Sequence, residues 1–286
     1  MAILLMLRTF IQRHPVAAYF VLAYLVTWGA IVLIVEPQGV GRGTITPSQF
    51  MLVWAAMLLG SGGVGLLLTA LLEGRAGLKS LLRGMGRWRV GRWWYAPLLI
   101  APLAVVIVLA VLSQTSPRFT PGIITASDKL SLVILFLVVA FGTFVEELGW
   151  TGFATRRLRG QASCLTLGLL VGVLWGTWHF MGDLTGSRAA YGDLFVPHFL
   201  AFWLVPLTAF RVLIVWVYDH TQSLLLTQLM HASYSPFLFV LGPTGLSASE
   251  SLTYEAAFTV VVCLVTLAVV ALERSRHVRP SEARVG

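Results

Sequence analysis

The sequence contains few charged residues. Of its 286 residues only 11% are Asp, Glu, Lys or Arg, whereas soluble domains usually carry about 25%. Hydrophobic residues make up 57% of the chain, and the mean hydropathy is +0.84. This composition excludes an ordinary soluble domain and predicts an integral membrane protein.

Cysteine is also scarce. Cys164 and Cys263 both lie in apolar runs and form no C-x-x-C pair, so we interpret them as packing residues rather than a disulfide or a metal site. The chain lacks an H-E-x-x-H motif, so the zincin pattern is absent. The formal net charge is +8, but no nucleic-acid-binding motif accompanies it. We therefore attribute the basic excess to a rim that faces anionic lipid in the bilayer.

Apolar runs long enough to cross a membrane recur along the whole chain. A spanning helix needs about 20 apolar residues, and we find eight such runs. The first is too long for the apolar region of a signal peptide and is interpreted as a retained span. The sequence predicts an all-α bundle forming a single membrane domain over residues 1–286. The runs fall near Ala17–Val35, Met51–Leu72, Trp93–Leu112, Leu130–Gly149, Cys164–Met181, Phe199–Tyr218, Ser223–Leu241 and Ala256–Leu272.

The Lys and Arg residues between these runs gather on one side of the bilayer. Because cytoplasmic loops are enriched in Lys and Arg, this distribution predicts a cell-membrane protein with both termini in the cytoplasm. The residues on the predicted inner side are Arg8, Arg13, Arg75, Lys79, Arg83, Arg87, Arg89, Arg92, Arg156, Arg157, Arg159, Arg274, Arg276, Arg279 and Arg284. Those on the predicted outer side are Arg42, Arg118, Lys129 and Arg188.

Two further segments each have two interpretations. Residues 73–92 place apolar and basic side chains at three-to-four spacing, which suits either a short surface helix or a solvated basic loop. The run G-S-G-G-V-G at Gly60–Gly65 permits close helix packing, which we expect within the monomer rather than between copies.

A few ionisable residues lie inside the predicted spans. Glu146 and Glu147 end the fourth run, His179 and His231 lie in the fifth and seventh, and Arg211 lies in the sixth. Charged groups in lipid are costly, so these side chains are expected to face the bundle interior and to contact each other. The helices that carry Glu146 and His179 are joined by a turn near residues 160–163. Measured along the helices from this turn, Glu146 lies about 20 Å away and His179 about 24 Å away. On antiparallel neighbours the two side chains would therefore lie at similar depth in the membrane.

Helical spacing adds two neighbours. Trp150 lies one turn after Glu146, and Ser235 lies one turn after His231. Ser235 would either hold a water or an oxyanion, or bond the backbone carbonyl four residues earlier. These residue types suit water activation by a hydrolase, proton relay in a transporter, or a structural network in which Glu147 pairs with Arg211.

Three segments together resemble the CAAX protease and bacteriocin-processing (CPBP or Abi) family of intramembrane proteases. They are E-E-L-G-W-T-G at Glu146–Gly152, W-G-T-W-H at Trp175–His179, and H-A-S-Y-S at His231–Ser235. The resemblance covers roughly residues 75–240 and includes the basic and aromatic stretch at Arg75–Tyr95.

The resemblance implies an eight-helix bundle with a cavity open to the cytoplasm, and cleavage near the C-terminus of a peptide or prenylated protein. Glu146 would be the general base, His179 would position water, and His231 with Ser235 would face the oxyanion. The family has been described both as metal-independent and as zinc-dependent; in the second case His179 and His231 would be the Zn²⁺ ligands.

Two positions depart from the family motifs. Thr151 stands where an arginine is usual, four residues after Glu147, and Ser235 stands where asparagine is usual. Arg156 lies on the opposite side of the helix from Glu147, so Arg211 is the better substitute partner. The departures leave open a catalytically weak or inactive relative that acts as an immunity or scaffold protein, with a transporter as a further alternative.

Overall fold

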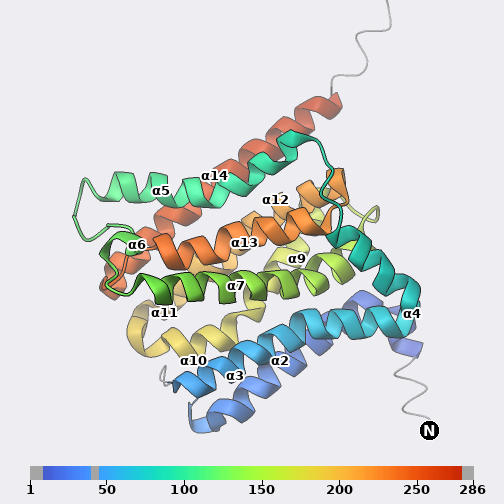
Figure 1. Ribbon diagram of the computed structural model, residues 1–286, viewed down its shortest axis with the longest axis horizontal. Coiled ribbons are helices and arrows are strands. Elements are labelled where there is room, and N and C mark those ends of the chain that lie inside the picture. Colours follow the sequence, from blue (N-terminus) through green and yellow to red (C-terminus); the bar gives the residue numbers. More distant parts are fainter. Residues whose placement is uncertain (1–8, 40–44, 279–286) are drawn as a thin grey trace, which may run out of the picture.

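The computed structural model describes residues 9–39 and 45–278 and, within them, consists of helices (Figure 1). In these ranges seven helices are long and apolar enough to cross a membrane, and one shorter apolar helix joins them. The chain is a multi-pass integral membrane protein. The predicted basic residues Arg8, Arg42, Arg279 and Arg284, and the side chain of Arg276, lie outside the part of the chain that is described.

The helices follow one another with short connections. The α-helices are α2 (Pro15–Gly39), α3 (Pro47–Leu58), α4 (Val64–Met85), α5 (Ile100–Leu112), α6 (Gly122–Thr125), α7 (Lys129–Gly149), α8 (Arg156–Leu158), α9 (Cys164–Trp178), α10 (Phe180–Tyr191), α11 (Phe195–His198), α12 (Val205–Thr221), α13 (Leu224–Leu241) and α14 (Ala248–Val278). Wider π-helical turns occur at η1 (Leu59–Gly63), η3 (Trp150–Thr155) and η5 (Phe199–Leu204), and 3₁₀ turns at η2 (Arg92–Leu99) and η4 (Gly192–Leu194).

The predicted eight spans are confirmed in part. Seven qualify as spans by length, while the predicted fifth span corresponds to the 15-residue α9. Its continuation, α10, ends at Gly192, whose φ of 54° breaks the helix before the chain enters α11 and α12. The start of α2 and the end of α14 lie at the same end of the bundle (Figure 1).

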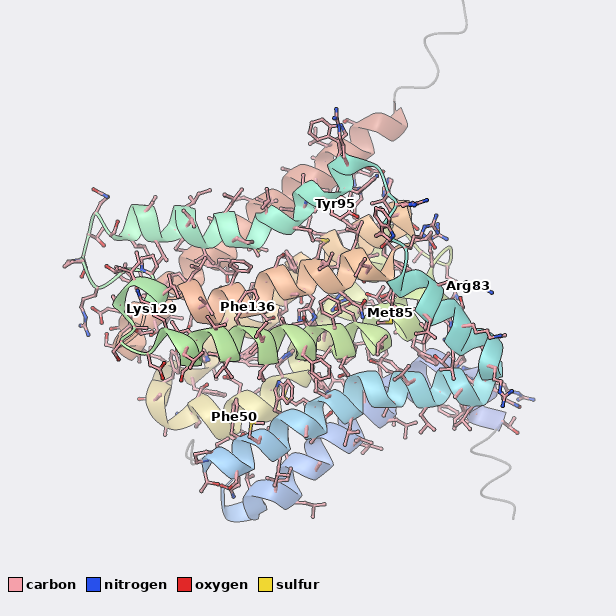
Figure 2. The ribbon with its side chains drawn as sticks, in the orientation of Figure 1. Phe50, Arg83, Met85, Tyr95, Lys129 and Phe136 are labelled. Atoms are coloured by element: carbon pink, nitrogen blue, oxygen red, sulfur yellow. The ribbon has the colours of Figure 1, made fainter. Side chains whose placement is uncertain are left out.

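The segment after α4's midpoint is helical, which decides between the two interpretations of residues 73–92. Gly74 has φ of 59° and ψ of −149°, a conformation that favours glycine, and it turns the second half of α4 away from the first. The helix then continues to Met85 at the edge of the bundle (Figure 2). Residues 75–85 are therefore helical, as the first interpretation requires, whereas residues 86–91 are not.

Two helix pairs form the centre of the bundle: α9 packs along α12, and α7 along α13. Glycines permit the first contact. A Cβ added at Gly168 would lie 2.5 Å from Val212 Cα, and one at Gly172 would lie 2.7 Å from Thr208 Cα. The two backbones are therefore in direct contact, on the face of α12 that carries Arg211.

The glycine run at Gly60–Gly65 packs within the chain, as predicted. A Cβ on Gly60 would collide with Thr27 of α2, one on Gly62 would lie 2.2 Å from Val145 O, and one on Gly65 would lie 2.6 Å from Gly149 Cα. The run therefore holds α7 at the level of Glu146 and Glu147.

This contact gives a matched pair of substitutions. Gly62→Ala should lower the free energy of unfolding by about 2 kcal/mol or more, because α7's backbone must move away from the added methyl group. Gly63→Ala should be close to neutral, because the nearest atom to its Cβ would be 3.6 Å away. Thermal unfolding in detergent measures both. Equal stability of the two variants would show that this contact does not hold α7.

Candidate active site

Glu147 is fully buried and its charge is neutralised from another helix. Arg211 on α12, also fully buried, donates from Nη2 to Glu147 Oε1 at 2.8 Å and from Nη1 to Oε2 at 2.9 Å. Thr151 donates its hydroxyl proton to Glu147 Oε2 and lies 3.4 Å from Arg211 Nη1. The predicted contact between Arg211 and Glu147 is therefore present in this fold. Arg156 instead bonds Glu73 and the carbonyl of Gly152.

Glu146 has a different environment from its neighbour. Trp150 and Trp175 each donate an indole N–H to Glu146 Oε2 at 3.2 Å. Hydrogen bonds from described residues reach only this oxygen, so Oε1 is left for water or substrate. The predicted pairing of Trp150 with Glu146 across one helical turn is confirmed. Trp175 adds a donor from α9 and thereby fixes the carboxylate between two helices.

His179 lies at the junction of α9 and α10. Its Nδ1 lies 3.0 Å from the carbonyl oxygen of Trp175, and because a carbonyl only accepts, Nδ1 carries a proton. The ring stacks on Trp203 with centroids 4.3 Å apart at 18°. These contacts fix the ring and assign Nε2 as the acceptor nitrogen in the neutral form.

His231 and Ser235 lie one turn apart on α13. His231 Nδ1 lies 3.1 Å from Glu147 Oε1, at an angle unlike that of a hydrogen bond, and its ring meets Trp175 edge-on at 4.7 Å. Ser235 is half-buried and makes no hydrogen bond to the residues that the structure describes. The backbone-bonded interpretation of Ser235 is therefore not supported, and its hydroxyl is free.

Four of the predicted site residues line one cavity of about 270 Å³: Glu146, His179, His231 and Ser235. They come from α7, α9/α10 and α13, so the fold brings together three segments that are far apart in the sequence. Glu147 and Arg211 lie behind this cavity wall, and Trp150 and Trp175 hold Glu146 from behind. In this fold Glu146 faces the cavity and Glu147 is withdrawn from it.

The cavity extends toward the end of the bundle that is poor in basic residues. Its lining includes Phe50 at the start of α3, Leu135 near the start of α7 and Phe239 near the end of α13. Figure 2 shows Phe50 at the same end as Lys129 and opposite Arg83. On the other side of Glu146, toward the arginines that follow α7, the fully buried side chains of Trp150 and Phe153 fill the interior.

This geometry bears on two sequence predictions together. Cytoplasmic termini and a cavity open to the cytoplasm were both expected, but the described chain ends and the cavity lie toward opposite ends of the bundle. If the cavity opens at the end toward which its lining extends, the two predictions exclude each other.

A zinc ion does not fit this donor set. Glu147 is engaged by Arg211 and Thr151, and two indole N–H groups already bond Glu146 Oε2. Among the described residues no group of three or more His, Cys, Asp or Glu side chains is arranged to hold a metal ion. The predicted zinc ligands His179 and His231 thus lack a third protein ligand among the residues that the structure describes.

A second polar network next to the cavity was missed from sequence. Asp183, His198 and Glu255 are all buried, and the imidazole bridges the two carboxylates. Asp183 lines the cavity four residues after His179. Asp183 and Glu255 fall outside the predicted spans, although the four-residue spacing of Asp183 from His179 was a usable signal because it predicts a shared helix face.

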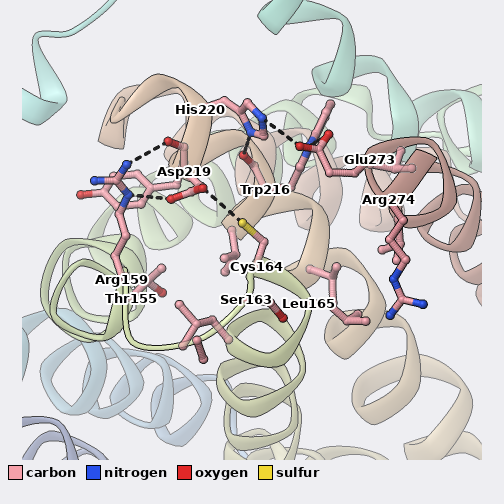
Figure 3. A pocket seen from close by; sticks show the side chains of 18 residues that line it. Thr155, Arg159, Ser163, Cys164, Leu165, Trp216, Asp219, His220, Glu273 and Arg274 are labelled. Carbon is pink, nitrogen blue, oxygen red and sulfur yellow. Dashed lines mark hydrogen bonds and ion pairs between the residues drawn. The ribbon is translucent and has the colours of Figure 1, made fainter. Parts of the chain in front are cut away.

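A larger cavity of about 520 Å³ lies at the basic end and is unrelated to the motifs (Figure 3). Arg159 pairs with Asp219 at 2.6 Å, Cys164 donates its S–H to the same carboxylate at 3.3 Å, and His220 Nε2 lies 3.3 Å from Glu273. None of the predicted site residues lines it. Its charged groups mainly satisfy one another.

The part of the chain that matches known proteins contains the candidate site. Residues 128–237 match the family model described as type II CAAX prenyl endopeptidase Rce1-like. The chain therefore contains an Rce1-like domain. A curated relative, CAAX prenyl protease 2 of Methanococcus maripaludis, is 32% identical over 91 residues, which is 29% of this chain and 32% of that protein. The match thus spans about a third of the relative's length. All predicted site residues lie within the Rce1-like domain.

The ion pair at the centre of the Rce1-like domain can be tested by exchange. Arg211→Ala leaves Glu147 buried without a cation and should cost about 3–5 kcal/mol of stability. Adding Thr151→Arg restores a charge one turn from Glu147, so the double variant should recover part of the loss. Thermal unfolding in detergent measures both.

The matched control for this exchange is Arg156→Ala. Arg156 is half-buried and shares Glu73 with Arg157, so its loss should cost much less. Arg211→Ala with wild-type stability would contradict the assigned role of the pair.

Proposed function

We propose that this chain is an intramembrane endopeptidase that cleaves a peptide bond in a C-terminal region of a peptide or protein with a water activated by Glu146. The proposal rests mainly on the different environments of two adjacent carboxylates. Glu147 is neutralised behind the cavity wall, whereas Glu146 lines the cavity with Oε1 free of described donors. The Rce1-like domain supports the same reaction class.

Glu146 would act as the general base. A water held at Oε1 loses a proton to the carboxylate as its oxygen attacks the scissile carbonyl. The two indole N–H groups on Oε2 keep the carboxylate in place for this transfer. When the tetrahedral intermediate collapses, Glu146 returns the proton to the leaving amine, and the bond between carbonyl carbon and nitrogen breaks.

His179, His231 and Ser235 would serve the water and the developing oxyanion. His179 Nε2 accepts a hydrogen bond from the attacking water and orients it. His231 donates from Nε2 to the oxyanion, while its Nδ1 faces Glu147 Oε1 at 3.1 Å. The free hydroxyl of Ser235 is a second donor.

The contacts of Arg211 weaken the case for an inactive relative. The missing arginine at Thr151 was the main reason to expect lost activity, and Arg211 supplies the same charge to Glu147 from α12. Ser235 lines the cavity with its hydroxyl unengaged, so the second departure keeps a donor there. We therefore prefer the active peptidase to a scaffold, an immunity protein or a transporter.

Replacing the base tests this proposal directly. Glu146→Gln should reduce cleavage of a mixed peptide pool by at least about 100-fold, because the amide cannot take the water's proton. Cleavage is measured by mass spectrometry on protein in lipid nanodiscs. Glu73→Gln, which removes a carboxylate near the arginines that follow α7, is the control. Unchanged cleavage by a folded Glu146→Gln protein would contradict this mechanism.

We further propose that the basic end of the bundle faces the cytoplasm in the cell membrane, and that the cavity opens on the opposite face. The described Lys and Arg residues are concentrated at one end, which favours that end as cytoplasmic. Substrate would then reach Glu146 from the non-cytoplasmic side or from the outer half of the bilayer.

Two exposed glutamines at opposite ends test the orientation. In a chain with Cys164 and Cys263 replaced by Ser, Gln114→Cys should react with a membrane-impermeant maleimide in intact cells. Gln161→Cys, beside the basic end, should react only after permeabilisation. Labelling of Gln161→Cys but not of Gln114→Cys in intact cells would place the cavity on the cytoplasmic side and contradict the proposed orientation.

A further inference from the structure

The second polar network combines three buried ionisable side chains, of which Asp183 and His198 lie in the Rce1-like domain and Glu255 lies beyond it. His198 Nδ1 lies 2.9 Å from Glu255 Oε2, and its Nε2 lies 3.2 Å from Asp183 Oδ1. Tyr191 donates to Glu255 Oε1 at 2.6 Å, and Ser187 donates to Asp183 Oδ1 at 2.7 Å. The network connects α10, α11 and α14 beside the catalytic cavity.

These contacts fix the protons on His198. Both ring nitrogens face carboxylate oxygens, which accept hydrogen bonds, so both nitrogens donate and the ring is an imidazolium. Two aromatic rings stack on the imidazole: Tyr191 with centroids 3.7 Å apart at 17°, and Phe202 with centroids 5.5 Å apart at 19°. Such faces favour a cation over a neutral ring.

The charges of the network do not cancel. Two carboxylates and one imidazolium leave one negative charge, and no described Lys or Arg forms an ion pair with Asp183 or Glu255. An unbalanced charge in a largely apolar, buried setting is costly unless something pairs with it. A cationic occupant of the cavity would balance this charge.

Asp183 is the member of the network that reaches the cavity. Its side chain is 3% exposed and it lines the cavity with Glu146, while its Oδ2 has no hydrogen-bond partner among the described residues. Trp203, which lines the same cavity, likewise has an indole N–H without a described partner. A buried acceptor without a donor is destabilising, so an occupant that donates to Asp183 would recover this loss.

We propose that Asp183 is a specificity-determining residue that binds a basic side chain, Lys or Arg, of the peptide substrate. This inference rests on the proposed peptidase function. Asp183 lies about 6 Å along the helix from His179, and an extended peptide advances about 3.4 Å per residue. The basic residue therefore lies within about two residues of the scissile bond. His198 and Glu255 are positioning residues that hold the Asp183 carboxylate.

A bare metal ion fits the site less well than a basic side chain. A metal ion needs several ligands around one point, and no group of three or more acidic, His or Cys side chains in the described ranges provides them. A guanidinium or ammonium group on a peptide needs only the one free carboxylate oxygen. Both side chains also carry an apolar stem that suits the cavity's apolar walls.

The experiment compares isosteric peptides that differ in charge. The Glu146→Gln protein in nanodiscs is titrated with two fluorescent decapeptide pools that carry arginine or neutral citrulline at one central position. We expect the arginine pool to bind on the order of tenfold to a hundredfold more tightly, as a charge-assisted hydrogen bond implies. Adding Asp183→Asn should bring the two dissociation constants within about twofold.

The matched control is Asp193→Asn, which removes an exposed carboxylate from the adjacent turn η4 and should leave the arginine preference intact. The proposal is overturned if the Glu146→Gln protein, which retains Asp183, binds the two pools equally or binds neither. This result does not depend on whether the Asp183→Asn variant folds. If the Glu146→Gln protein prefers the arginine pool but the unsubstituted chain cleaves no peptide, the peptidase function is refuted while the binding site for a basic side chain is supported.

Discussion

The buried ion pair between Glu147 and Arg211 is the interaction on which the rest of the site depends. Lipid offers a carboxylate no solvation, so the adjacent acids need partners from the protein itself. Arg211 also stacks its guanidinium over Trp175, 4.1 Å from the ring centroid, and the same indole donates its N–H to Glu146. His231 meets that ring edge-on. The pair that neutralises one glutamate thereby positions the tryptophan that holds the other.

Close backbone packing makes this arrangement possible. Gly168 and Gly172 bring α9 against α12, so that Trp175 and Arg211 face each other. Directly after the two glutamates the helix widens into the π-turn η3, where Thr155 donates to the carbonyl of Trp150 five residues earlier. Turns of this kind recur at functional sites because they shift the side chains that follow. Here Trp150 and Thr151, at the start of the turn, bond Glu146 and Glu147 respectively.

Much of the site follows from sequence because the membrane limits the choice of partners. A carboxylate within a span must meet a cation, and Arg211 was the one cation inside a predicted span, so the pairing with Glu147 was predictable. The depth argument likewise brought Glu146 and His179 together. The direction of the cavity was not predictable, since it depends on which side of Glu146 the large side chains fill. The spacing of Asp183 from His179 was a local signal, but the pairing of Asp183 with His198 and Glu255 was missed. That pairing depends on how α11 packs against α14, which no local pattern reveals.

Moving the positive charge from position 151 to Arg211 changes what the charge does. An arginine at Thr151 would pair with Glu147 along one helix, one turn away, and would stabilise that helix alone. Arg211 lies on α12, so the same pair also joins α12 to α7 at the centre of the bundle. Neutralisation of Glu147 then requires the correct packing of two helices rather than one local turn. Stability and the electrostatics of the site are therefore coupled through a single side chain, and Thr151 is free to act as a small hydroxyl donor within the pair.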